Sequence, residues 1–194
     1  MIPVEAHVSM NDVPIVGLQW TDRTWTFSVP VGVFLTLLER LRGAPVRALN
    51  CWLLLEALAA VRVNGSWSAK QHIGHLVDLH ELDEQRLREF INRAAILSPA
   101  DPTNLRTEHA GHDKTPTSVI LHRFRFRREA LVERMESLST EDVVVVATHP
   151  RLGQPFRLID WVYFIAEHDD HHLAAARHAL RLASVSPSTE VALG

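Results

Sequence analysis

The segment from about 157 to 184 constrains the fold most, because its apolar residues recur with the period of one long amphipathic helix. One face of that helix is marked by Leu158, Trp161, Val162, Ile165, Ala176 and Leu180. His168 and His172 fall on the same face, at positions where leucine or valine would continue the stripe. The helix therefore combines a core-facing stripe with two imidazoles that point the same way.

Three further segments have a helical period of apolar residues, and they run from about 31 to 61, from 68 to 96 and from 115 to 138. Gly43-Ala44-Pro45 is expected to break or kink the first of them. Ser68 and Gln71 form a capping box at the start of the second. Thr115-Pro116 supplies an N-cap and a first helical residue for the third.

Four amphipathic helices in one chain of 194 residues predict an all-α fold, a single four-helix bundle over residues 30–184. The connections before the third and fourth helices are longer than a minimal bundle needs, so neighbouring helices need not be antiparallel. The stretch 98–114 is expected to be a polar loop. The β-branched run 143–148 predicts an extended segment, which His149-Pro150 and the residues after it follow as a turn.

Residues 1–29 are expected to form an N-terminal arm that packs on the bundle through Trp20 or Trp25. The alternation of threonine and aromatic residues in this arm predicts a short hairpin that turns near Asp22-Arg23. Residues 185–194 are expected to form a flexible tail.

Composition narrows the class of protein. The chain is 46% hydrophobic and 22% charged, which is ordinary for a globular domain. Its net charge of −3 provides no overall basic field for nucleic acid or a membrane surface. The single cysteine, Cys51, excludes an intrachain disulfide and suits a reducing cytoplasm. We see neither a secretory signal pattern nor an apolar run long enough to span a membrane.

The histidine pair of the last helix predicts a metal site, because neutral imidazoles at positions i and i+4 can bind one ion. A third ligand should come from the second helix, which offers His72, His75 and His80. His75 lies inside that helix next to apolar residues and can point into the bundle. His72, nearer the helix end, is expected to contact water, and His80 lies more than a turn beyond His75.

Three imidazoles with one open position are typical of a catalytic zinc site, whereas structural sites usually have four protein ligands. Such a set also suits Ni²⁺, and Fe or Mn less well. An open position can hold water or a substrate that the metal polarises. The alternative is that these are core histidines with hydrogen-bonded neighbours. His171 diverges from the apolar face and is expected to be exposed or to lie outside the ligand set.

At these residues the chain resembles the DinB superfamily, the four-helix bundles that include the YfiT-type metal-dependent enzymes. The resemblance covers about residues 30 to 184 and rests on four short motifs in order. They are Gly65-Ser66-Trp67-Ser68, His75-Leu76-Val77-Asp78-Leu79-His80, His149-Pro150-Arg151-Leu152-Gly153 and Glu167-His168-Asp169-Asp170-His171-His172-Leu173. It implies a metal triad of His75, His168 and His172, an unusual bundle connectivity, a bound divalent ion (often nickel or zinc) and a homodimer. Family members with known activity mostly transfer or isomerise with low-molecular-weight thiols such as bacillithiol, glutathione and mycothiol.

Three further residues are catalytic candidates. Asp78, one turn after His75, matches the family's acidic position and could accept an N–H from a ligand imidazole; it could equally be a solvated carboxylate. Glu56 could lie level with His75 as a base, although an edge residue that reaches water is the favoured interpretation. His149 could line the pocket or stabilise a turn.

A basic cluster on the third predicted helix does not indicate a nucleic-acid reader. Its arginines, Arg123, Arg125, Arg127 and Arg128, are spread around the helix rather than along one face. Trp67 and Trp161 could wall the metal site, although tryptophans at helical spacing are usually core residues.

Three functions remain open from the sequence. The first is a metal-dependent enzyme, a thiol transferase or a hydrolase, that acts on a small-molecule substrate. The second is a non-catalytic metal-binding stress-response protein, and the third is a metal-free dimerisation or partner module.

Overall fold

The computed structural model describes residues 20–50 and 56–185. The five long helical segments are α1 (Phe34–Leu49), α3 (Ala69–Asp78), α4 (His80–Ile91), α6 (Thr117–Glu136) and α8 (Leu158–Val185). Short elements are η1 (Trp20–Asp22), η2 (Val31–Val33), α2 (Glu56–Ala59), α5 (Leu105–His109), η3 (His112–Lys114), α7 (Thr140–Val143), β1 (Val146–Thr148) and β2 (Pro155–Arg157). The expectations for residues 1–19 and for the tail after Val185 lie outside the described residues.

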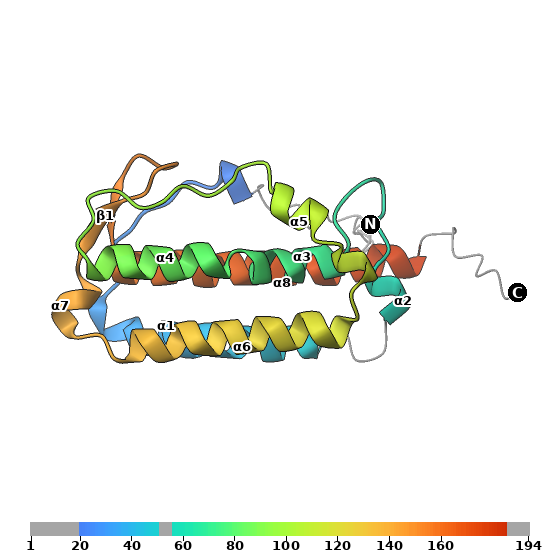
Figure 1. The fold of residues 1–194 in the computed structure, drawn as a ribbon, viewed down its shortest axis with the longest axis horizontal. Coiled ribbons are helices and arrows are strands. Elements are labelled where there is room, and N and C mark those ends of the chain that lie inside the picture. Colours follow the sequence, from blue (N-terminus) through green and yellow to red (C-terminus); the bar gives the residue numbers. More distant parts are fainter. Residues whose placement is uncertain (1–19, 51–55, 186–194) are drawn as a thin grey trace, which may run out of the picture.

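The all-α four-helix bundle predicted from the sequence is confirmed, with α3 and α4 forming one of its four rods (Figure 1). α1 packs against α6 and α8, and α3 packs against the same two helices. The first two long helices therefore lie diagonally across the bundle. In Figure 1, α1 and α8 run in one direction while α3, α4 and α6 run in the other, so two pairs of neighbours are parallel. The long crossovers make this order possible.

Local signals account for most helix boundaries. The capping box is present at α3, where the Ser68 hydroxyl accepts from the backbone N–H of Gln71 and the Gln71 side chain accepts from the N–H of Ser68. α6 begins one residue later than predicted, with Pro116 as N-cap. α1 continues through Pro45, contrary to the expected break. Pro45 is buried in the bundle, and this packing outweighs the loss of one backbone hydrogen bond.

Other predicted boundaries were wrong. The second predicted helix divides at Leu79 into α3 and α4, and it ends at Ile91 because Arg93 has a left-handed φ of 56°. The predicted polar loop 98–114 contains α5 and η3. Only the last three residues of the run 143–148 are a strand, β1, which pairs antiparallel with β2.

The N-terminal arm has no hairpin in its described part. After η1 the chain runs along the bundle without a strand partner, and its aromatic side chains contact α8 as well as one another. The rings of Trp20 and Trp25 lie 5.0 Å and 4.9 Å from that of Phe164. The backbone N–H of Val29 donates to Asp160 in the first turn of α8 at 3.0 Å. The arm is therefore tied to the helix that carries the histidine pair.

Ion pairs between three buried side chains connect α4, α6 and α8 in the bundle interior. Arg128 of α6 contacts Asp169 of α8 at 2.7 Å and Asp83 of α4 at 3.3 Å, and all three residues are buried. Arg125 on the same helix is exposed, which confirms that the arginine cluster of the sequence is spread around α6. Within the described ranges, no helix has the length and apolarity needed to cross a membrane.

Candidate metal centre

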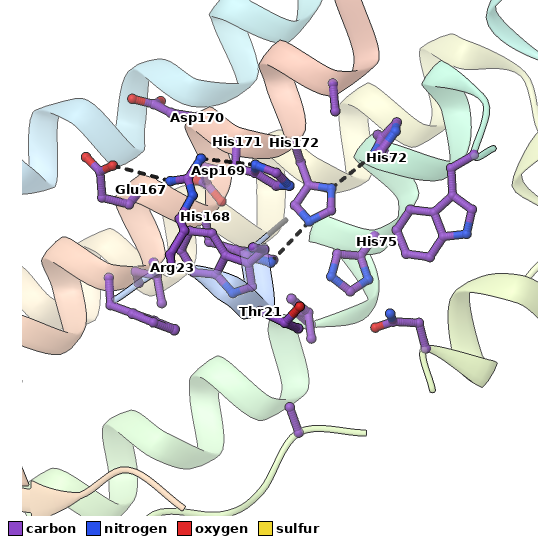
Figure 2. Close-up of a pocket in the computed structure, with 18 of the residues that line it drawn as sticks. Thr21, Arg23, His72, His75, Glu167, His168, Asp169, Asp170, His171 and His172 are labelled. Carbon is purple, nitrogen blue, oxygen red and sulfur yellow. Dashed lines mark hydrogen bonds and ion pairs between the residues drawn. The ribbon is translucent and has the colours of Figure 1, made fainter. Parts of the chain in front are cut away.

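Three histidines meet where α3 crosses α8. His75 comes from α3, and His168 and His172 come from successive turns of α8, whose antiparallel packing on α3 brings the rings together (Figure 2). Their ligand nitrogens all lie within 4.8 Å of one another. The Nε2 atoms of His168 and His172 are 3.1 Å apart. These are the residues that the sequence singled out as metal ligands, and the fold places them together.

Hydrogen bonds decide which ring nitrogens face the common point. The Nδ1 atom of His75 lies 3.1 Å from the Thr107 hydroxyl, and the Nδ1 atom of His172 lies 3.1 Å from Nδ1 of His72. Since these nitrogens are engaged elsewhere, Nε2 of His75 and of His172 is left to bind an ion. Metal-binding histidines are commonly oriented in this way through their second nitrogen.

The cluster is electrostatically prepared for a cation. Burial, reinforced by the neighbouring imidazoles, holds the pKa of His168 and of His172 well below the ordinary value. Burial also lowers the pKa of His75 to about 4. All three rings are therefore neutral at pH 7, with a lone pair available on each. Three neutral imidazoles fit a divalent ion of the zinc or nickel type.

Asp78 supports His75 through an intermediate residue. The Thr107 hydroxyl donates to Asp78 at 3.0 Å, so its oxygen accepts from Nδ1–H of His75. His112 donates from Nε2 to the same carboxylate oxygen at 2.8 Å. Asp78 therefore does not touch the ligand imidazole, but it orients the hydroxyl that does.

Thr107 and His112 were missed by the sequence reasoning, because both lie in the stretch expected to be a loop. The available signal was Gly74, a glycine inside a helix directly before His75. The His112 ring rests on the backbone of Gly74, and a Cβ built at that position would lie 2.3 Å from the ring. Only glycine lets His112 reach Asp78.

His72 was expected to contact water, and the structure adds a contact with a candidate ligand. The side chain is half-buried and meets His172 through the contact between their Nδ1 atoms. Trp67 covers this side, with its ring centroid 5.5 Å from that of His72 and 5.1 Å from that of His75. Trp161, in contrast, is fully buried in the hydrophobic core.

The N-terminal arm closes the other side of the cluster. The ring of Trp20 lies 4.7 Å from that of His168 and 5.7 Å from that of His171. Arg23 donates to Nδ1 of His171 at 3.2 Å, as Figure 2 shows. His171 is half-buried beside the three histidines and is not part of the ligand group.

Comparison with known proteins assigns this arrangement to a family. The sequence profile of the DinB superfamily matches residues 37–176, a span that includes all three histidines. The chain belongs to the DinB superfamily.

The DinB fold is also seen in a solved structure. YfiT from Bacillus subtilis, described as a probable metal-dependent hydrolase with an unusual four-helix bundle topology, superposes with a TM-score of 0.73. The alignment covers 84% of this chain and 95% of YfiT at 16% sequence identity. No curated protein matches the chain. The likeness to YfiT therefore shows a shared fold.

The DinB histidines of this chain open onto a cavity of about 1480 Å³. Its walls include the three histidines, the flanking Trp20 and Trp67, and the buried group of Asp83, Arg128 and Asp169. Burial raises the pKa of Asp169 to about 7 despite the adjoining Arg128. The volume exceeds the usual range for pockets that hold small molecules, so the cavity has room for one beside the imidazoles.

The other histidine candidates lie apart from the ligand group. His149 lines the same cavity, but its Nδ1 accepts the backbone N–H groups of Arg151 and Leu152 at 3.2 Å. It therefore stabilises its turn and faces the cavity at once, the two roles that the sequence left open. His80 is half-buried on α4, where burial and the nearby Arg127 lower its pKa to about 4.

Glu56 is not brought to the three histidines. This exposed carboxylate accepts from Lys70 at 2.6 Å and from the backbone N–H of Thr117 at 3.1 Å. The hydrogen bond from Lys70 is the main cause that lowers the pKa of Glu56 below its ordinary value, and Thr117 adds to it. Burial acts in the opposite direction. Glu56 therefore joins α2 to the starts of α3 and α6, as the edge residue that was the favoured interpretation.

Proposed function

We propose that this DinB-superfamily protein is a metal-dependent enzyme that acts on a small molecule at the His75, His168 and His172 centre. One observation carries the proposal: three neutral imidazoles converge at the wall of a cavity large enough for a substrate. A site whose purpose is only structural usually has a fourth protein ligand. Among the described residues, the metal-binding group consists of these three histidines alone.

A divalent ion held by three imidazoles would supply a Lewis acid that activates water or a thiol, or polarises a carbonyl or similar group. The residues of the chain prepare the site for that chemistry. Thr107 and Asp78 keep the proton of His75 on Nδ1. The Nδ1 atom of His172 is in contact with Nδ1 of His72. Trp20 and Trp67 lie against the imidazoles and limit access of bulk water.

Two reactions suit this arrangement. Hydrolysis uses an activated water, and it is the activity named for the structurally similar YfiT. Transfer of a low-molecular-weight thiol uses an activated sulfur, and it is implied by the family resemblance of the motifs. Zinc and nickel are the ions that three imidazoles favour, ahead of iron or manganese.

The test begins with metal content. Untagged protein loaded with Zn²⁺ or Ni²⁺ is expected to bind one ion per chain, and His168→Ala and His172→Ala are expected to bind far less. His109→Ala provides the control, because His109 is an exposed histidine of α5 outside the ligand group. Loaded protein is then screened for hydrolysis of esters, amides and phosphoesters, and for conjugation of thiols to electrophiles.

Two results would contradict the enzyme proposal. Turnover that is unchanged in both α8 variants would remove the metal centre from the reaction. One bound ion with strong thermal stabilisation and no turnover in any screen would favour the non-catalytic metal-binding protein instead. The homodimer and the cytoplasmic location stay predictions, which light scattering and cell fractionation can test.

A further inference from the structure

The cavity contains a second cluster of polar groups, away from the three histidines. Arg86 of α4, and His149 and Arg151 of the turn after β1, all line it. The charges of Arg86 and Arg151 both lower the pKa of His149, after burial, so the three side chains lie within electrostatic range of one another. The cluster therefore gathers cationic groups at one part of the cavity wall.

Arg86 is a buried cation without a carboxylate partner. The structure describes two buried arginines, and Arg128 has ion pairs with two aspartates while Arg86 has none. Arg86 donates from Nε and Nη2 to a single neutral acceptor, the carbonyl oxygen of Ser98, at 2.9 Å and 2.8 Å. Burying a guanidinium without a counter-ion is costly, and an anion in the cavity would offset that cost.

Asp83 does not serve as the missing partner. Its charge and that of Glu89 both raise the pKa of Arg86 against the dominant effect of burial, but the Asp83 carboxylate is hydrogen-bonded to Arg128 and the Glu89 carboxylate to Ser98. Burial raises the pKa of Asp83, while the charges of Arg128 and then Arg86 lower it.

Arg151 and His149 add two more donors to the same wall. Arg151 is exposed, and its side chain donates to the carbonyl oxygen of Thr21 at 3.3 Å, which again is a neutral acceptor. His149 accepts at Nδ1, so its neutral ring carries the hydrogen on Nε2. Guanidinium groups and an imidazole N–H together are the donors that bind carboxylate or phosphate oxygens.

This cluster and the metal centre belong to one space. Arg151 and His168 line the same cavity. Arg151 donates to the carbonyl oxygen of Thr21, and the neighbouring Trp20 has its ring 4.7 Å from that of His168. We propose that Arg86, Arg151 and His149 bind the carboxylate or phosphate group of an organic anion whose reacting end lies at the three histidines. The role of that anion as substrate rests on the proposed function, whereas its binding does not.

Binding is tested on protein treated with a chelator, so that no anion can bind to a metal. Inorganic phosphate, acetate and succinate are titrated at constant ionic strength, with chloride as the reference salt, and binding is followed by calorimetry and by NMR shifts. Saturable binding above the chloride reference is expected. Arg151→Ala and Arg86→Gln are each expected to weaken it by about tenfold or more, since each removes a charged hydrogen-bond donor.

Matched variants separate this inference from others. Arg88→Ala removes an exposed arginine of α4 outside the cavity, and it is expected to bind like the wild type. His168→Ala is expected to lose metal and keep anion binding, so a failed metal centre would not be mistaken for a failed anion site. Arg151→Ala changes an exposed side chain and keeps the test informative if Arg86→Gln does not fold.

The titrations decide whether the anion site exists and which class of anion it binds. Binding of phosphate alone assigns a phosphate ester, binding of acetate or succinate alone assigns a carboxylic acid, and binding of both supports the site without choosing. Absence of binding above chloride would overturn the inference, as would equal affinity in the wild type, Arg151→Ala and a folded Arg86→Gln.

Discussion

The Nδ1 atom of His75 lies 3.1 Å from the Oγ1 atom of Thr107, which joins a ligand on a bundle helix to a residue of a connecting segment. The same hydroxyl donates to Asp78 one turn further along α3. This path fixes the tautomer of His75 before any ion binds, because the hydroxyl has one hydrogen and Asp78 takes it.

Thr107→Val should weaken metal binding while the bundle stays folded. Valine has a similar shape but cannot accept from His75, so the imidazole loses its fixed tautomer and orientation. We expect Zn²⁺ affinity to fall by about 10- to 100-fold, the usual effect of losing such a partner. Competition with a chromogenic chelator measures it. Thr107→Ser should restore most of the affinity. Thr103→Val changes an exposed threonine and should leave the affinity unchanged. Wild-type affinity in Thr107→Val would refute this hydrogen-bonded path.

Gly74→Ala should destabilise the fold, although alanine is normally the better helix former. The new Cβ would lie 2.3 Å from the His112 ring and would push it away from Asp78. We expect a loss of about 1–3 kcal/mol in the free energy of unfolding, the typical cost of overpacking. Gly43→Ala is the matched control in α1, where the Cβ meets only an arginine nitrogen at 3.7 Å. Urea denaturation should show a neutral or stabilising effect there; a Gly74→Ala protein as stable as Gly43→Ala would be inconsistent with the packing.

Arg128→Met should be among the most destabilising single changes in α6. Arg128 contacts two buried aspartates, and its removal leaves Asp83 and Asp169 without their counter-charge. Breaking a buried pair in this way typically costs about 3–5 kcal/mol. Arg125→Met, three residues earlier, loses only a surface pair with Glu129 and should cost about 1 kcal/mol or less. Comparable denaturation midpoints for the two variants would contradict the buried network.

Acid should destabilise the protein through His149. Burial lowers the pKa of His149 to about 4, against 6.5 for an ordinary histidine. Above pH 6.5 the ring is neutral in both states, so its contribution to stability is complete. Between pH 6.5 and 4 only the unfolded chain takes up the proton, and stability falls by about 1.4 kcal/mol per pH unit for this group.

His149→Asn should remove that part of the pH dependence. Asparagine keeps an acceptor for the turn N–H groups but does not titrate. The unfolding free energy of wild type and variant is measured by urea denaturation at several pH values from 7 to 4. The difference between the two slopes isolates His149 from the other buried histidines, and identical slopes would show that the ring titrates normally in the folded state.

The four helical segments and the histidine trio were predictable because each rests on a local period. Apolar residues every three or four positions define a helix face, and His168 and His172 lie on such a face in α8. His75 followed from the same reasoning applied to α3. The boundaries were less predictable where packing overrides propensity, as at Pro45, which a helix interior tolerates here because its ring is buried.

The partners of the histidines were not predictable, because they come from segments without a period. Thr107 and His112 lie in the connection between α4 and α6, and Trp20 lies in the arm, so no helical spacing relates them to the histidines. Gly74 indicated a close approach to α3 but not which residue makes it. The expected hairpin failed for a related reason. Its aromatic residues alternate as in a strand, and Trp20 and Trp25 contact each other, but both rings also pack against Phe164 of α8 and the backbone around them forms no strand.

By itself the sequence determined the helix faces, the bundle class and the residue types that can hold a metal, since these depend on spacing along the chain. The tertiary structure alone decided that α3 crosses α8 at the histidines, that Thr107 holds the ring of His75, and that Arg86 is buried against the carbonyl oxygen of Ser98. Those relationships join residues far apart in the chain, and only the packing of the helices and their connections brings such groups within hydrogen-bonding distance.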